Sequence, residues 1–401
     1  VTQVSIRRPD MTLEFERRAD LWVMLEPASD TADQSAVKML LHEIAKSEID
    51  KRFSVEKTDL AEYGLDRPAA TIRLSTSSQK DILVLDIGSH NLTKSSCFVR
   101  LGTALDVLLI PSALRRYALM SAFDYRNKRV FEIPITDITR IRLVSNVQKV
   151  DWSRDDMGSW YAAVMEDTIA GDPTRIDNIV RELRGLRAKD IPFPIAGSGG
   201  FFSEVAGIIE LWTRELTDTV RVQFSSDPDS SGTCYVAVTP PGRVSVVESV
   251  VLGIFDNTYN DLRDRHLLEF DADEITRIVM RGPDTEISIT RSGSDWTFAN
   301  PEFGAIKTAS VNAFLKRIKT LEYATAIEER SVQSSRFDFR DPVYRLTLFD
   351  SDGRQVDELM SGGPLLDNAY SYVTSSSTGV VASIDGSEMA ALLTELLNVA
   401  E

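Results

Sequence analysis

The sequence has little of the material from which metal sites and catalytic nucleophiles are built. Only three His and two Cys occur among 401 residues. His42-Glu43 begins like the helix of a zinc protease, but Lys46 stands where that motif needs its second His. His90 and His266 have no Cys, His or paired carboxylate near them at metal-ligand spacing. We therefore expect no metal, no cofactor and no catalytic residue.

Long apolar runs and an excess of positive charge are also missing. The best apolar stretch, Val244 to Phe255, contains Glu248 and Ser249 and is shorter than the ~18 to 20 residues that cross a bilayer. Lys and Arg total 45 against 61 Asp and Glu, which gives a formal net charge of −16. Such a field repels phosphate backbones, so nucleic acid is not an expected partner.

The first residues carry no targeting signal. The sequence opens on strand-like Val1-Thr-Gln-Val-Ser-Ile-Arg7, without an initiator Met and without a basic segment followed by an apolar one. The natural N-terminus was either removed or not included, so the missing signal does not decide the compartment.

The chain has the composition of a globular protein and contains an internal repeat. Apolar residues make up 43% and charged residues 26%, and at ~150 residues per domain the length predicts two to four domains. One constant offset aligns the first and last thirds without a gap. The aligned pairs include Trp22 with Trp296, Tyr63 with Phe337, Leu65 with Phe339, Pro68 with Pro342, Gly88 with Gly362 and Phe98 with Tyr372. Half of that offset gives a repeat period of about 137 residues.

The middle third matches the first at the same period, to within one position. The junction Arg126–Glu132 (RNKRVFE) recurs as Arg263–Glu269 (RDRHLLE), and the same tetrapeptide, Ile-Thr-Arg-Ile, follows each junction at 138–141 and 275–278. These signatures predict three tandem repeat units over residues 1–133, 134–270 and 271–401.

Each unit is predicted to be α+β. Alternating apolar residues in Val4–Ile6, Leu13–Phe15 and Leu21–Leu25 indicate a hairpin at the start of the unit. A helix follows, and a second, short helix is expected to end near Gly64. Four further strands are predicted over 71–74, 82–87, 97–101 and 107–110. With a closing helix over Ser112–Phe123, each unit becomes a mainly antiparallel sheet with helices packed on one face.

The first helix of each unit has the same apolar face, with residues spaced i, i+3, i+4 and i+7. These residues, called the helix stripe here, are Val37, Leu40, Leu41 and Ile44 in the first unit, Ile176, Ile179, Val180 and Leu183 in the second, and Val311, Phe314, Leu315 and Ile318 in the third. Because one spacing appears three times independently, the pattern strongly predicts a helix whose stripe faces the core of each unit.

Several motifs are better explained by packing than by chemistry. Ala196-Gly-Ser-Gly-Gly200 imitates a nucleophile elbow but lacks its first Gly and its strand-to-helix framing, which favours a flexible loop. Cys97 and Cys234 occupy equivalent strand positions and are predicted to be buried free thiols rather than a disulfide. The repeated Trp22, Trp160 and Trp296 are predicted core anchors rather than an aromatic binding ladder.

The middle unit departs from the other two and holds the candidate partner contact. Where the first and third units have a Tyr-Gly-Leu or Phe-Asp-Phe segment followed by Pro, it has a Pro-rich stretch, the Gly loop and a segment, Ser203–Leu216, that is predicted to be helical. The apolar residues of this segment cover more than one narrow stripe. Ile208, Leu211 and Trp212 are therefore candidate contact residues for a partner protein, and extra intramolecular packing is the alternative.

The order of these motifs resembles a bacterial family, the domain of unknown function 4340. The motifs that carry the resemblance are Trp22-Val-Met-Leu-Glu-Pro27, Ala32-Asp33 before a Val-x-x-Leu-Leu helix, Asp59-Leu-x-x-Tyr-Gly-Leu-x-x-Pro68, Leu85-x-Ile-Gly88 and Arg126-Asn-Lys128. The match is clearest in residues 4–143 and again from 275 onward, and the middle unit is a divergent copy because it lacks Tyr-Gly-Leu-x-x-Pro.

The resemblance implies an auxiliary component of gliding-motility-type ABC transporters in the cell envelope. It implies exposure on the periplasmic or extracytoplasmic face of the cytoplasmic membrane, an N-terminal membrane anchor absent from this sequence, and contacts with ABC transporter membrane subunits. The family supplies no catalytic residue. We therefore expect a non-enzymatic scaffold that acts through protein–protein contacts.

Two other functions stay open from the sequence. An envelope solute- or glycan-binding protein would need a site between repeats, lined by aromatic residues such as Tyr161, Trp152 or Tyr259. A hydrolase would need Ser198, His266 and a carboxylate within hydrogen-bond reach of one another.

Overall fold

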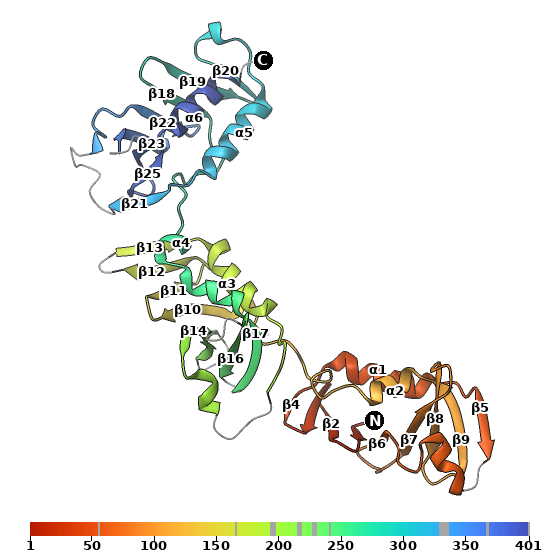
Figure 1. Ribbon diagram of the computed structural model, residues 1–401. Coiled ribbons are helices and arrows are strands. Elements are labelled where there is room, and N and C mark those ends of the chain that lie inside the picture. Colours follow the sequence, from red (N-terminus) through yellow and green to blue (C-terminus); the bar gives the residue numbers. More distant parts are fainter. Residues whose placement is uncertain are drawn as a thin grey trace. The chain divides into compact units, whose positions relative to one another are not determined.

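The computed structural model contains three antiparallel sheets of nine, eight and eight strands (Figure 1). It describes residues 1–54, 57–164, 167–192, 198–214, 219–226, 231–239, 242–328, 337–365 and 369–399. Each sheet carries helices, so the predicted fold class, tandem α+β units built on antiparallel sheets, is confirmed. The sheets fall one in each of the ranges 1–133, 134–270 and 271–401, and the unit boundaries themselves stay a prediction.

The first sheet has the strand order β4-β3-β2-β1-β6-β7-β8-β9-β5. Its strands are β1 (Gln3–Arg7), β2 (Thr12–Arg18), β3 (Leu21–Glu26), β4 (Asp30–Thr31), β5 (Lys51–Ser54), β6 (Ala70–Ser75), β7 (Leu83–His90), β8 (Ser96–Leu101) and β9 (Asp106–Pro111). Strand β1 is central because it pairs with β2 on one side and β6 on the other. Helices α1 (Gln34–Lys46) and α2 (Ala113–Ala118) lie along one face of this sheet (Figure 1).

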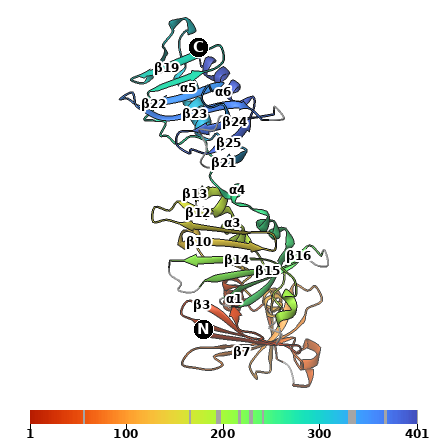
Figure 2. The same cartoon turned by 90° about the vertical axis from the view of Figure 1, so that its left-hand side faces the viewer.

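The second sheet repeats the order of the first from β4 to β9, as β13-β12-β11-β10-β14-β15-β16-β17, and Figure 2 shows β10, β14 and β15 side by side. Its strands are β10 (Ile138–Ser145), β11 (Lys149–Arg154), β12 (Trp160–Val164), β13 (Asp167–Gly171), β14 (Val205–Thr213), β15 (Val220–Ser225), β16 (Thr233–Thr239) and β17 (Arg243–Glu248). Its helical segments are η2 (Ile135–Asp137), α3 (Pro173–Gly185), η3 (Ser198–Phe202), η4 (Ser249–Asp256) and α4 (Tyr259–Leu262).

The third sheet has the order β20-β19-β18-β22-β23-β24-β25-β21. Its strands are β18 (Arg277–Arg281), β19 (Glu286–Ser292), β20 (Asp295–Phe298), β21 (Thr325–Glu328), β22 (Tyr344–Phe349), β23 (Gln355–Pro364), β24 (Tyr370–Ser375) and β25 (Val381–Asp385). Helices α5 (Thr308–Lys319) and α6 (Glu388–Leu397) and the turn η5 (Pro301–Phe303) complete this part. The order of seven strands, β3-β2-β1-β6-β7-β8-β9 in the first sheet, therefore recurs in all three sheets, as the repeat predicts. Among the described residues, the second sheet has no strand at the position of β5, and the third has none at the position of β4.

The apolar helix stripe buries one face of each sheet and excludes water from it. In the first sheet, Val37 and Leu40 of α1 are fully buried against inward-facing strand residues such as Ile6 and Ile72. Helix α1 begins where the side chain of Asp33 accepts hydrogen bonds from Ser35 N and Ala36 N, which satisfies two of the unpaired N–H groups at a helix start. Burial of the stripe then fixes the helix on the sheet.

Two predicted helices differ from those observed. The helix predicted over Ser203–Leu216 is wrong, because residues 205–213 form strand β14, hydrogen-bonded to both β10 and β15. The closing helix of the first unit, predicted over Ser112–Phe123, spans only Ala113–Ala118. It ends early because Ser121 and Asp124 form a separate turn, in which Ser121 Oγ donates to Asp124 Oδ2 at 2.7 Å.

By their internal contacts the residues form two compact units. One comprises Val1–Lys149 and Ile179–Phe255, and it holds the first sheet, β10 and β14 to β17. The other comprises Val150–Asn178 and Asp256–Glu401, and it holds β12, β13 and the third sheet. Both junction sequences lie inside a unit, the first in the former and the second in the latter.

A pair of aromatic rings recurs on the outer face of each sheet, the face opposite the first α-helix of the repeat. In the first sheet, Tyr63 of η1 (Lys57–Tyr63) packs on Phe98 of β8 with ring centroids 4.9 Å apart. The equivalent pairs are Phe337 with Tyr372, at 5.0 Å, and Phe201 with Tyr235, at 4.5 Å. Phe201 lies one repeat period after Tyr63, to within one position, so the middle unit keeps this aromatic although it lacks the Tyr-Gly-Leu motif.

The backbone at Tyr63 and at Phe337 explains why β7 and β23 each have a glycine, Gly88 and Gly362, at the same position of the repeat. A Cβ added to Gly88 would collide with the carbonyl oxygen of Tyr63, and one added to Gly362 would collide with that of Phe337. Glycine is therefore needed at both positions because another backbone lies directly against the strand.

Gly88→Ala should lower the free energy of unfolding by about 1 to 3 kcal/mol, because the new methyl group has no room beside the Tyr63 backbone. Gly185→Ala is the matched control, since a Cβ there meets nothing within 4 Å. Urea unfolding of both variants checks the difference. Equal midpoints for Gly88→Ala and the unchanged protein would contradict the packing argument.

The two junction segments, residues 125–130 and 262–267, are hydrogen-bonded along both of their edges. One edge is hydrogen-bonded to the residues just before the first helix of the preceding repeat, which is α1 for the first junction and α3 for the second. The other edge is hydrogen-bonded to the residues just after the first helix of the following repeat, which is α3 for the first junction and α5 for the second. In the first junction the bonds are Asp33 N to Tyr125 O at 2.8 Å, Asn127 N to Thr31 O at 2.9 Å and Ala188 N to Lys128 O at 2.8 Å. In the second they are Asp172 N to Leu262 O at 2.9 Å, Asp264 N to Ala170 O at 2.9 Å and Tyr323 N to Arg265 O at 3.0 Å. The repeated junction sequence thus forms the same backbone ladder twice.

A buried charge network reinforces the first junction. Arg126 Nε donates to Asp30 Oδ2 at 2.6 Å, and Arg126 Nη1 donates to the carbonyl of Ile191, also at 2.6 Å. The guanidinium of Arg243 lies 3.6 Å from Asp30 Oδ1 and donates to the Asn127 carbonyl. Burial lowers the pKa of Arg243, and the Asp30 carboxylate opposes that shift. Asp30 therefore compensates two guanidinium groups at once, the buried one of Arg126 and the half-buried one of Arg243.

Asp30→Asn should destabilise the chain by about 3 to 5 kcal/mol, because it removes the carboxylate that pairs with the buried Arg126 and lies beside the half-buried Arg243. Asp20→Asn makes the same change at a 96% exposed carboxylate that pairs with Arg17, and it should cost less than about 1 kcal/mol. Thermal unfolding of the two variants measures the contrast. Similar midpoints would show that the network contributes no more than a surface ion pair.

Candidate functional site

The predicted contact residues Ile208, Leu211 and Trp212 lie on one strand but do not share a face. Successive residues of β14 point to opposite sides of the sheet, and Leu211 points into the core, where it is fully buried. Ile208 and Trp212 lie on the outer face and are half-buried. Of the three residues, only Ile208 and Trp212 therefore have exposed side-chain surface.

Trp212 contacts two arginines of the neighbouring strand β10. The guanidinium carbons of Arg140 and Arg142 are 4.7 Å and 5.0 Å from its ring centroid. Strand register produces this arrangement, because Arg140 lies directly opposite Trp212 and Arg142 lies opposite Glu210. Arg142 Nη1 also donates to Glu210 Oε2 at 3.0 Å. Cation–π contact and the ion pair hold the indole in place. We call these residues, together with Ile208, the Trp212 face.

A similar pair occurs on the third sheet and is absent from the first. Arg277 of β18 lies 5.2 Å from the ring centroid of Phe349 on β22, and the two residues are register partners. Each lies one repeat period after its counterpart, Arg140 or Trp212. The corresponding partners on the first sheet are Gln3 and Ser75. The sequence analysis did not predict this Arg–aromatic pair. It could have been found from the repeat period, because an Arg and an aromatic residue recur at the same two positions of the second and third repeats.

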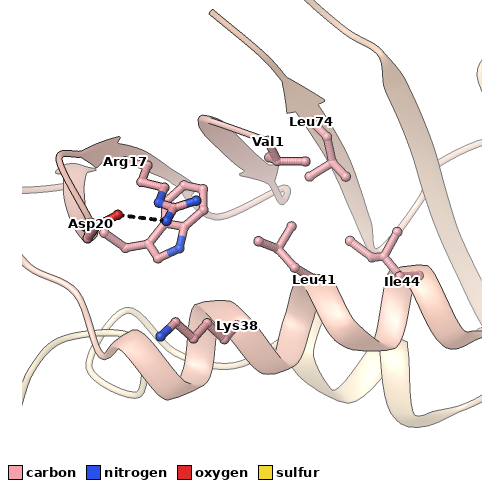
Figure 3. Close-up of a pocket in the computed structure, with 9 residues that line it drawn as sticks. Val1, Arg17, Asp20, Lys38, Leu41, Ile44 and Leu74 are labelled. Atoms are coloured by element: carbon pink, nitrogen blue, oxygen red, sulfur yellow. Dashed lines mark hydrogen bonds and ion pairs between the residues drawn. The ribbon is translucent and has the colours of Figure 1, made fainter.

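A hollow of about 540 Å³ opens at one end of the first repeat's core. Figure 3 shows Leu41 and Ile44 projecting from α1 toward Val1 and Leu74 on the sheet side. Trp22, only 3% exposed, forms part of its wall. At its rim lie Lys38 and the Arg17–Asp20 ion pair, with Arg17 Nη2 and Asp20 Oδ1 3.1 Å apart.

The residues considered for chemistry do not converge in the described ranges. His42 is exposed on α1, and His90 Nε2 lies 3.2 Å from Arg115 Nη1. His266 pairs with Asp264, two residues away in the second junction. The side chain of Ser198 and residues 193–197 lie outside the described residues, so the loop and the hydrolase hypothesis stay untested. Among the described residues, no three His, Cys, Asp or Glu are grouped to hold a metal ion.

The aromatic residues proposed for ligand binding are mostly used for packing. Trp152 is completely buried, and its ring lies 5.8 Å from that of Tyr259, whose hydroxyl accepts a hydrogen bond from Asp151 N. Tyr161 is 39% exposed on β12. The repeated Trp22, Trp160 and Trp296 are 3%, 2% and 3% exposed, which confirms their prediction as core anchors.

Both cysteines are free and buried, as predicted. Desolvation raises the pKa of Cys97 to about 11, although nearby Arg115 favours the thiolate. The thiol therefore stays protonated at neutral pH and belongs to the core of the first repeat rather than to reactive chemistry.

Tandem α+β repeats with a shared strand order define the class of protein to which this chain belongs. The family described as domain of unknown function DUF4340 matches residues 22–198 and 207–325, and the chain is a member of it. No curated protein and no solved structure matches the chain. No helix in the described part of the chain is long and apolar enough to cross a bilayer.

At pH 8 the folded protein should resist alkylation of Cys97, because a thiol with a pKa of about 11 is only about 0.1% thiolate at that pH. Iodoacetamide labelling in a Cys234→Ser background, read by mass spectrometry, isolates this thiol. Unfolding in urea at the same pH should restore rapid labelling. Rapid labelling of the folded chain would contradict the burial.

Proposed function

We propose that this chain is a non-enzymatic scaffold on the periplasmic or extracytoplasmic face of the cytoplasmic membrane. In this proposal it is an auxiliary subunit of a gliding-motility-type ABC transporter, held by an N-terminal anchor and bound to the transporter's membrane subunits. Membership of the DUF4340 family and the resemblance described above support the assignment. The proposed action is protein–protein contact, without turnover of a substrate.

The Trp212 face is the observation that carries the contact proposal. Trp and Arg are the residues most enriched where interfaces derive their binding energy. Here an indole ring has two guanidinium carbons at 4.7 Å and 5.0 Å from its centroid, and the apolar Ile208 lies on the same outer face, four residues earlier on the strand. Because the strands already hold these side chains, ordering them against a partner would cost little conformational entropy.

A solute- or glycan-binding role has less geometric support. Two of the three aromatic residues that it would use, Trp152 and Tyr259, pack on each other, and Trp152 has no exposed surface. A ligand of that class would need exposed ring faces to stack on.

Trp212→Ala should weaken binding of the anchored native protein to its neighbouring ABC permease subunits by about tenfold or more, the effect of removing an interface hot spot. Co-purification in detergent, followed by titration of the isolated permease complex, measures the loss. Phe349→Ala is the matched control, because it removes the equivalent ring from the third sheet.

The control should bind as the unchanged protein does, and both variants should unfold at similar temperatures. Undiminished recovery of the permease with Trp212→Ala would exclude this face as the contact. Equal losses with both variants would show that the effect is not specific to the Trp212 face.

A further inference from the structure

The outer face of the third sheet has a hollow of about 210 Å³. It lies over four neighbouring strands, β19, β18, β22 and β23, which Figure 1 shows side by side. Val279 of β18 and Thr347 of β22 are register partners that line the hollow, and because each is only 7% exposed they form its floor. We call this place the arginine hollow, because Arg277, Arg281 and Arg345 also line it.

Strand register places two like charges next to each other in the arginine hollow. Arg281 of β18 lies directly opposite Arg345 of β22. Like charges at directly opposed strand positions destabilise a sheet. The same two positions pair an arginine with a threonine on the first sheet and two apolar residues on the second, namely Arg7 with Thr71 and Val144 with Ile208. Of these three pairs, only that of the third sheet opposes two arginines.

Two carboxylates neutralise part of the charge in the hollow. Glu286 Oε2 accepts a hydrogen bond from Arg281 Nε at 2.7 Å. Glu358 Oε2 lies 3.7 Å from Arg345 Nη1, beyond hydrogen-bond distance, and accepts instead from the hydroxyl of Thr347 at 3.2 Å. Three arginines against two glutamates leave the lining of the hollow with a formal charge of +1. This positive site lies in a chain whose net charge is −16.

Two of the arginines have N–H groups that are open to a ligand. Within the ranges that the structure describes, the guanidinium of Arg345 donates no hydrogen bond. Arg277 donates through Nε to Ser288 Oγ at 3.3 Å, and its guanidinium carbon lies 5.2 Å from the ring centroid of Phe349. These contacts hold Arg277 in place and leave its terminal N–H groups available. Parallel N–H groups of a guanidinium match two oxygens of a carboxylate or phosphate.

We propose that the arginine hollow binds one phosphate or carboxylate group of a small soluble ligand. Arg345 and Arg277 donate to its oxygens, and its negative charge offsets the repulsion between Arg345 and Arg281. The hollow is smaller than the ~300 to 1,000 Å³ sites that enclose drug-sized ligands, so it fits a single anionic group. An anionic lipid surface is a poorer source of that group, because the net charge of −16 repels it.

The site shares no residue with the Trp212 face, so this proposal goes beyond the proposed function. The test uses the full chain, with inorganic phosphate and acetate as separate probes and sodium chloride added to keep the ionic strength constant. The rise of the thermal unfolding midpoint with probe concentration gives an apparent dissociation constant. We expect a saturable rise with at least one of the two probes.

Arg345→Gln should raise that dissociation constant by about tenfold or more, because it removes the donors of charge-assisted hydrogen bonds to the probe. Arg7→Gln is the matched control. Arg7 occupies the position of Arg281 on the first sheet but lies opposite Thr71 rather than a second arginine. The control should therefore leave the constant unchanged.

A variant with increased affinity separates binding from folding. Glu358→Gln removes one carboxylate from the hollow and keeps an acceptor for the Thr347 hydroxyl. Loss of this negative charge should lower the dissociation constant by about threefold or more. Damage to the fold cannot produce that change.

Three results would overturn the proposal. The first is a midpoint that rises equally with probe concentration in Arg345→Gln and in the unchanged protein, or that rises with neither probe. The second is unchanged or weaker binding in Glu358→Gln. The third is Arg345-dependent sedimentation with phosphatidylglycerol vesicles while neither free probe binds, which would assign the anion to a lipid surface. None of these measurements involves the permease subunits, so failure here is distinguishable from failure of the proposed function.

Discussion

The hydrogen bonds along both edges of each junction segment are the constraint on which the rest of the architecture depends. A backbone that passes between two sheets must satisfy its N–H and C=O groups, and the junctions do so by pairing with one repeat on one edge and the next repeat on the other. The first junction adds Asp30, which compensates Arg126 and Arg243 in a site that excludes most water. The repeated junction sequence is therefore a connector between repeats that has a defined hydrogen-bonded structure.

The outer faces of the sheets are covered differently from the faces under the helices, which are buried by the helix stripe. Each outer face is partly covered by an aromatic pair that recurs in all three sheets. In the first and third sheets a neighbouring backbone also approaches a strand so closely that only glycine fits beneath it. Away from these pairs, strand register determines which polar and aromatic residues meet. On the second sheet it places Trp212 opposite Arg140 and near Arg142, whereas the same register on the first sheet pairs Gln3 with Ser75.

Much of the fold could be predicted because its signals are local and repeated. The helix stripe and the alternating strands each reflect a single period, and three copies remove most of the ambiguity. Strand β14 was missed because Ile208 and Trp212 on its outer face are as apolar as Ile209 and Leu211 on its inner face, which hides the alternation. The Arg140–Trp212 pair and the hollow beside Leu41 depend on register and burial, and neither is a property of a single segment.

The double-edged junctions also bear on how such a chain can change during evolution. Because each connector bonds to the same two positions in the repeats on either side, gain or loss of one whole repeat period would leave every sheet edge paired as before. Gain or loss of part of a period would instead remove one of the two bonding partners of a connector and leave backbone groups of that connector unpaired. Unequal recombination at the connector is therefore a tolerated route by which relatives of different copy number could arise.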